Sequence, residues 1–87
     1  MRLGFRIANI VKEWRSLKTE SYVSDPDGLT FAVSWVDGLL HTLKRHRNDK
    51  DFCSDIVLSA HEHFVKELTD QEQGDVFAYL LGLTVRS

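Results

Sequence analysis

The sequence contains few of the residues that reveal a compartment or a chemistry. It has one cysteine, Cys53, in 87 residues, so it cannot form an intramolecular disulfide, and such usage is typical of a reducing compartment. It has no run of about 18 consecutive apolar residues, so it predicts no membrane-spanning helix. Arg6, Asn9 and Lys12 interrupt the first apolar residues, so we expect no signal peptide. These absences predict a cytoplasmic protein that does not enter a membrane.

Catalytic motifs are also absent. The sequence has no GxSxG, no glycine-rich phosphate loop, no CxxC and no HExxH, which are the arrangements that hold a nucleophile, a phosphate, a redox pair or a zinc ion. We therefore expect a protein that is not an enzyme and that binds no cofactor.

A metal site could be assembled only from residues with unsuitable spacing. Cys53, His61 and His63 could join His41 or His46, but metal ligands that share a helix usually lie three or four residues apart. His61 and His63 would point about 200° apart on a helix, and His41 and His46 are separated by five residues. We therefore predict no metal site.

The charges nearly balance, but they are unevenly distributed along the chain. The formal net charge is -2, so no overall field attracts nucleic acid or an anionic membrane. Residues 1–47 carry eight basic against five acidic side chains, a sum of +3, and residues 48–87 carry three against eight, a sum of -5. This asymmetry favours attraction between the two halves of the fold, and a dipolar surface that steers a charged partner is the alternative.

The clearest pattern predicts a helix over residues 26–47, at the centre of the fold. Its apolar residues recur at the three-and-four spacing of an amphipathic helix; they are Leu29, Ala32, Val33, Val36, Leu39, Leu40 and Leu43. Asp25 suits the N-cap and Pro26 the first helical position. The alternation of Leu29, Phe31, Val33 and Trp35 would also suit a strand, but the helical pattern continues for two turns beyond Trp35.

Three more amphipathic segments predict helices over residues 2–18, 52–68 and 70–84, with a loop over residues 19–24. Thr69 and Glu72 have the spacing of a capping box, so the last helix begins after a very short connector and should turn a sharp corner. The predicted fold is all-α: a single domain over residues 1–87 forming a compact four-helix bundle. We expect a core of twelve residues: Ile7, Ile10, Trp14, Val33, Val36, Leu40, Leu43, Val57, Phe64, Leu68, Val76 and Leu80.

Two features of the later helices have a structural and a functional interpretation. Gly74, Ala78 and Gly82 form a stripe of small residues, which suggests close approach by another helix, either of this chain or of a second copy. We therefore consider both a monomer and a homodimer. His61 lies among apolar positions, which predicts a buried, neutral imidazole with a hydrogen-bond partner; a pH-sensitive switch is the functional alternative.

For function, the sequence favours a small protein-binding module, such as an adaptor, regulator or inhibitor that occupies a surface of a larger protein. Aromatic side chains dominate interface hot spots, so Phe5, Phe31 and Trp35 are candidate anchors, together with Phe52. Arg45 and Arg47 are candidate contacts at the end of the central helix. The alternative is a nucleic-acid-associated regulator that uses a basic patch, composed of Arg2, Arg6, Lys44, Arg45 and Arg47.

Overall fold

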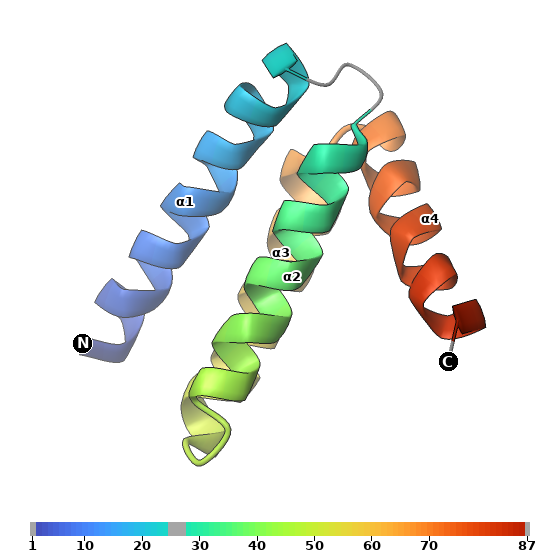
Figure 1. The fold of residues 1–87 in the computed structure, drawn as a ribbon. Helices are drawn as coiled ribbons and strands as arrows, with labels where there is room; N and C mark the ends of the chain where they lie inside the picture. Colours follow the sequence, from blue (N-terminus) through green and yellow to red (C-terminus); the bar gives the residue numbers. More distant parts are fainter. Residues whose placement is uncertain (1, 25–27, 87) are drawn as a thin grey trace.

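Four helices account for the described part of the chain, which confirms the predicted all-α fold (Figure 1). This computed structural model describes residues 2–24 and 28–86, with side chains for residues 6–20 and 28–83. The helices are α1 (Arg2–Ser24), α2 (Leu29–Arg45), α3 (Lys50–Glu67) and α4 (Asp70–Arg86).

Helix α2 begins three residues later than the sequence predicts. Its N-cap is Gly28, which has a φ of 78° in the left-handed region, where a residue without a Cβ is strongly favoured. The Gly28 carbonyl accepts the first helical hydrogen bond, from the N–H of Ala32 at 3.0 Å. The predicted caps Asp25 and Pro26 lie outside the described residues. At the other end, Lys44 and Arg45 lie in the last turn, where cations complement the helix dipole.

Helix α1 continues to Ser24, so the loop predicted over residues 19–24 is wrong. Residues 19 and 20 are exposed, so their polarity ends the apolar stripe without opposing the helix. No glycine or proline occurs between Leu17 and Ser24, and those are the residues that end a helix most effectively. The end of the apolar pattern therefore does not mark the end of α1.

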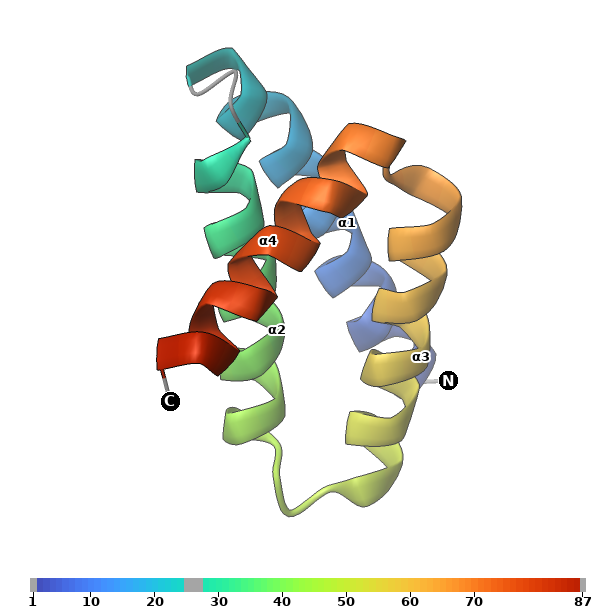
Figure 2. The ribbon, with the colours of Figure 1, turned by 90° about the vertical axis from the view of Figure 1, so that its right-hand side faces the viewer.

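Helix α2 is the central element, as predicted, because it packs against all three other helices. Helices α1 and α3 also pack against each other, whereas α4 packs mainly on α2 and crosses it obliquely (Figure 2). The largest buried cluster takes residues from all four helices: Trp14, Phe31, Ala32, Trp35, Val36, Ala60, Leu68 and Val76. Fully burying a large apolar side chain contributes about 1.5–3 kcal/mol, so this cluster is the main source of stability.

The connection between α3 and α4 is a sharp corner, as the sequence predicts. Leu68 adopts an extended conformation at the end of α3, and the capping box follows directly. The Glu72 carboxylate accepts a hydrogen bond from the Thr69 N–H at 2.7 Å, and the Thr69 hydroxyl accepts one from the Glu72 N–H at 3.2 Å. From this corner α3 and α4 diverge (Figure 2).

The predicted core is correct at its centre and wrong at its edges. Trp14, Val36, Leu68 and Val76 are buried, but the outward faces of α2, α3 and α4 leave three predicted core residues exposed: Leu40, Val57 and Leu80. The close approach predicted at the glycines of α4 is not made within the described part of the chain, because a Cβ added at Gly74 or Gly82 would meet nothing within 4 Å.

Candidate functional site

Three of the predicted anchors are core residues instead of surface residues. Phe31 is 0 % exposed and Trp35 is 5 % exposed, and Phe52 is buried as well. The apolar stripe of α2 is wide because three helices pack around it, so its margin is covered within the monomer. The proposal of an exposed Phe31/Trp35 anchor is therefore wrong. The side chain of Phe5 lies outside the described residues.

The buried histidine is His63 and not His61. His61 is exposed, whereas His63 is 3 % exposed and lies on the same face as Phe52, Ile56 and Ala60. Apolar residues surround most of α3, so its sequence suits more than one inward stripe. The predicted core residue Val57 and the predicted buried His61 are both exposed, so the predicted inward stripe is rotated relative to the one that meets α1 and α2. The spacing of Phe52, Ile56 and Ala60, four residues apart, is compatible with the stripe that turns inward, but it does not exclude the predicted one.

The imidazole of His63 packs against two tryptophans from two other helices. Its ring centre is 5.6 Å from that of Trp14 on α1 and 6.2 Å from that of Trp35 on α2, and it is nearly parallel to the Trp35 ring, at 17°. The two tryptophan rings are 5.7 Å apart. This aromatic cluster joins α1, α2 and α3 at the centre of the bundle.

A hydrogen bond from Trp35 determines the tautomer of His63. The Trp35 Nε1–H donates to His63 Nδ1 at 3.1 Å, and an indole nitrogen can only donate. The Nδ1 atom must therefore be an unprotonated acceptor, and the proton of the neutral ring lies on Nε2. That Nε2 is 3.3 Å from Glu67 Oε2, but it makes no hydrogen bond of good geometry with any described residue. The contact with Glu67 is electrostatic.

Glu67 connects this buried histidine to cations on α1. The Arg15 guanidinium binds the Glu67 carboxylate with two hydrogen bonds, from Nε to Oε2 at 2.9 Å and from Nη2 to Oε1. Lys18 donates to the Glu67 backbone carbonyl at 3.1 Å and lies 3.5 Å from the buried carboxylate of Glu72. Attraction between the basic first half and the acidic second half of the chain is thus made within the monomer, at the seam between α1 and the α3–α4 corner.

These surroundings move the pKa values of two groups in the cluster. Burial lowers the pKa of His63 below its ordinary value of 6.5, and the Glu67 carboxylate partly offsets that effect. The hydrogen bond from Arg15 lowers the pKa of Glu67. Both shifts favour a neutral imidazole beside an ionised carboxylate at neutral pH.

Beside His63 lies a small cavity of about 140 Å³ between α1 and α3. It is lined by Val11, Arg15, Ser59, Glu62, His63, Lys66 and Glu67. Its charged groups include both signs, and the Nε2 atom of His63 is itself buried. With two basic and two acidic side chains in its lining, the cavity selects neither an anion nor a cation.

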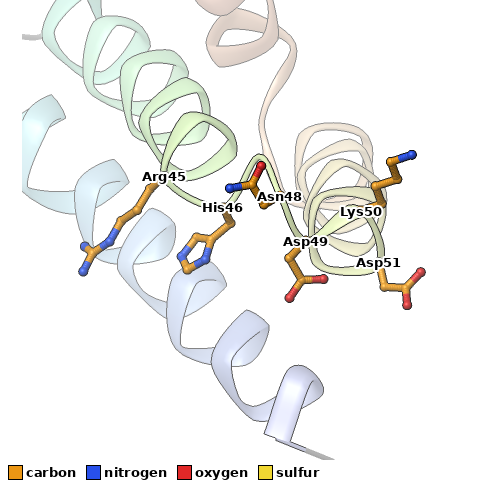
Figure 3. Close-up of a pocket in the computed structure, with 6 residues that line it drawn as sticks. All are labelled: Arg45, His46, Asn48, Asp49, Lys50 and Asp51. Atoms are coloured by element: carbon orange, nitrogen blue, oxygen red, sulfur yellow. The ribbon is translucent and has the colours of Figure 1, made fainter.

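The predicted arginines lie at the end of α2 and just beyond it, and Arg45 lines a second hollow (Figure 3). Arg45 and Arg47 are exposed. The hollow has a volume of about 640 Å³ and is lined by Arg45, His46, Asn48, Asp49, Lys50 and Asp51. The basic side chains of this lining, Arg45 and Lys50, are accompanied by the carboxylates of Asp49 and Asp51. These carboxylates weaken the attraction of the hollow for phosphate.

Arg6, another member of the predicted basic patch, makes contacts within the bundle. It donates to His46 Nδ1 at 3.3 Å, and its guanidinium lies 4.4 Å from the centre of the Phe52 ring, which is a cation–π distance. Asp49 caps α3 by accepting from the Phe52 N–H at 3.1 Å. These contacts connect the beginning of α1 to the α2–α3 connection.

Most of the exposed large apolar side chains of the described residues lie on α3 and α4. Phe77 is 58 % exposed and Leu81 is 60 % exposed. Half-buried Phe64 of α3 contacts Phe77 edge to face, with ring centres 6.0 Å apart, so the exposed Phe77 adjoins α3. We call this surface the α3–α4 apolar face and define it by Val57, Leu58, Val65, Phe77, Leu80 and Leu81. The sequence pattern does not indicate this face, because it predicts Val57 and Leu80 as core residues.

Within the described residues, no three His, Cys, Asp or Glu side chains are grouped so that they could hold a metal ion. No helix in the described ranges has both the length and the apolarity needed to cross a membrane. Comparisons of the chain with protein-family models, curated proteins and solved structures give no match.

Proposed function

We propose that this chain is a non-enzymatic protein-binding module that occupies a surface of a larger protein through its α3–α4 apolar face. The observation that carries the proposal is the exposure of Phe77 and Leu81 on α4, where Phe77 also contacts Phe64 of α3. Single exposed apolar side chains are common, but a contiguous group on neighbouring helices is typical of an interaction site. The proposal thus keeps the type of function expected from the sequence and replaces its anchors.

The charges around this face indicate the chemistry of the partner. Among the described side chains of α3 and α4, seven are acidic, and two, Lys50 and Lys66, are basic. Asp70 lies on the same stripe of α4 as Phe77 and Leu81, at spacings of seven and eleven residues, and Glu62 lies one turn from Leu58 and Val65 on α3. A partner should therefore present an apolar contact surface edged by Lys or Arg, because complementary charge favours encounter and register.

The test compares a double glutamine variant of the α3–α4 apolar face with a control glutamine variant at an exposed leucine elsewhere. Phe77→Gln with Leu81→Gln removes the centre of the α3–α4 apolar face, and Leu29→Gln removes an equally exposed leucine from the start of α2. Proteins retained by each immobilised variant are identified, and those that depend on Phe77 and Leu81 are purified and titrated by calorimetry. We expect a binary complex that weakens at least ten-fold in the double variant and is unchanged by Leu29→Gln.

Three outcomes contradict the proposal. One is a set of retained proteins that is the same for the wild type and the double variant. Another is a wild-type dimer that the double variant converts to a monomer, because a second copy would then occupy the face. The third is binding to DNA or RNA with a steep dependence on salt, which would support the basic patch as the functional surface.

A further inference from the structure

The buried histidine at the centre of the bundle is not part of the α3–α4 apolar face. His63 is enclosed by α1 and α2, and its ring contacts Trp14 and Trp35. A titratable group in such a place is unusual, because protonation would put a charge where apolar and aromatic side chains exclude water. Protonation of the imidazole in acid therefore affects the packing of α1, α2 and α3 together.

Protonation changes the hydrogen-bonding role of the atom that faces Trp35. In the neutral ring Nδ1 is the acceptor of the indole proton at 3.1 Å. A protonated imidazole carries hydrogens on both nitrogens, so Nδ1–H and the Trp35 Nε1–H would be two donors pointing at each other. The neutral ring fits this position and the charged ring does not, whatever occurs at Nε2.

Charged groups on three helices face the imidazole, and their effects on the charge largely oppose one another. Arg15 and Lys18 of α1 disfavour a charge on His63, and Glu67 of α3 and Glu72 beyond the corner favour it. Both carboxylates also contact α1 cations. Helix α2 contributes the Trp35 donor. The local charges therefore do not remove the conflict at Nδ1.

We propose that His63 is a proton-sensitive contact of the core, which holds α1, α2 and α3 together when neutral and separates from Trp35 when protonated. The released charge would move toward Glu67 and the α1–α3 surface, where the small cavity beside it lies. Mild acid would thus loosen the seam between Trp14, Trp35 and α3.

The direction of the pH dependence follows from the different environments of the ring in the folded and unfolded chains. In the unfolded chain His63 titrates near its ordinary value of 6.5, and burial lowers the pKa in the folded chain. Below 6.5 the unfolded chain binds the proton first, so the folded state loses stability as the pH falls toward the folded pKa. Above 6.5 the ring is neutral in both states and makes no contribution to the slope.

The experiment uses the same substitution at a buried and an exposed histidine of α3. His63→Asn keeps an acceptor oxygen near the Trp35 donor but cannot titrate, and His61→Asn is the matched control on the exposed side. Denaturant unfolding is measured from pH 7.5 to pH 5. Between 6.5 and the folded pKa, we expect the His63 contribution to raise the wild-type unfolding constant by up to ten-fold per pH unit. His63→Asn should lose that contribution and His61→Asn should retain it.

A second measurement keeps the inference testable if His63→Asn does not fold. In the wild-type chain, NMR follows the His63 ring and the Trp35 indole N–H through the same pH range. We expect the indole signal to shift, and its hydrogen exchange to accelerate, as His63 protonates. A folded-state His63 that titrates at or above 6.5, or an indole signal that does not follow it, would overturn the inference. The inference would also be overturned if both asparagine variants kept the wild-type dependence of unfolding stability on pH.

Discussion

Val36 and Leu40 lie one turn apart on the same stripe of α2, yet Val36 is 2 % exposed and Leu40 is 49 % exposed. Val36 belongs to the buried cluster that includes Val76 of α4. Because α4 crosses α2 obliquely (Figure 2), it covers only part of the stripe. The extent of the core on α2 is therefore determined by the crossing of a second helix and not by the pattern of α2 alone.

This difference predicts opposite outcomes for the same substitution one turn apart. Val36→Asp buries an unpaired carboxylate, at a cost of about 5 kcal/mol or more, which is comparable to the whole stability of a small domain. Its thermal unfolding, followed by circular dichroism, should lose its cooperative transition. Leu40→Asp should melt within about 5 °C of the wild type. Similar melting of the two variants would show that Val36 is not in the core.

The glycines of α4 and α2 predict a second contrast. A Cβ at Gly74 meets nothing within 4 Å, so Gly74→Ala should stabilise the fold by about 0.5–1 kcal/mol through better helix propensity. Gly28 has a φ of 78°, so Gly28→Ala should destabilise it by about 1–2 kcal/mol. Chemical denaturation measures both. A destabilised Gly74→Ala variant would indicate close packing at α4, as in a dimer.

The corner between α3 and α4 depends on the hydroxyl of Thr69. Thr69→Ala removes the acceptor of the Glu72 N–H and should cost about 1 kcal/mol. Thr69→Ser retains the hydroxyl and serves as the control, so it should lose much less. Denaturant midpoints compare the two variants, and equal losses would mean that the methyl group, not the cap, is responsible.

The contact between Glu67 and His63 predicts a change in the pKa of the histidine. The Glu67 carboxylate favours the charged imidazole, so Glu67→Gln should lower the pKa of His63 further. Glu67→Gln also removes the carboxylate that neutralises Arg15. The positive charge of Arg15 then disfavours a protonated His63 more strongly, which lowers the pKa of His63 further. NMR titration of the His63 ring measures the shift, and Glu62→Gln, at an exposed position on the same helix, should leave it unchanged. A raised pKa of His63 in the Glu67→Gln variant would contradict the electrostatic contact between Glu67 and His63.

The sequence predicts those features that depend on local chemistry. The four helices, the capping box at Thr69 and Glu72 and the centrality of α2 follow from periodicity and from side chains that satisfy nearby backbone groups. The inward face of α3 does not follow in this way. Both Phe52–Ile56–Ala60 and the stripe around His61 have helical spacing, and only the positions of α1 and α2 select the first.

The same limit explains why the candidate site differs from the predicted one. Phe31 and Trp35 are suited to an interface anchor and to a core equally well, because the same aromatic surface serves both. Exposure of Phe77 and Leu81 depends on how far α4 diverges from α3 after the corner, and no residue in either helix encodes that angle by itself. The contact between Trp35 and His63 joins positions 28 residues apart, beyond the reach of any local pattern.

Because α4 packs mainly on α2, the four helices need not unfold as one cooperative unit. Helices α1, α2 and α3 share the aromatic cluster, so their amides should be protected from hydrogen exchange up to the free energy of global unfolding. We expect α4 to open in a smaller, partial unfolding that exposes Val76 and uncovers Val36 while the tryptophans remain packed. The native state would then include a minor population with a larger apolar surface than the closed bundle, available to any binding partner that selects it.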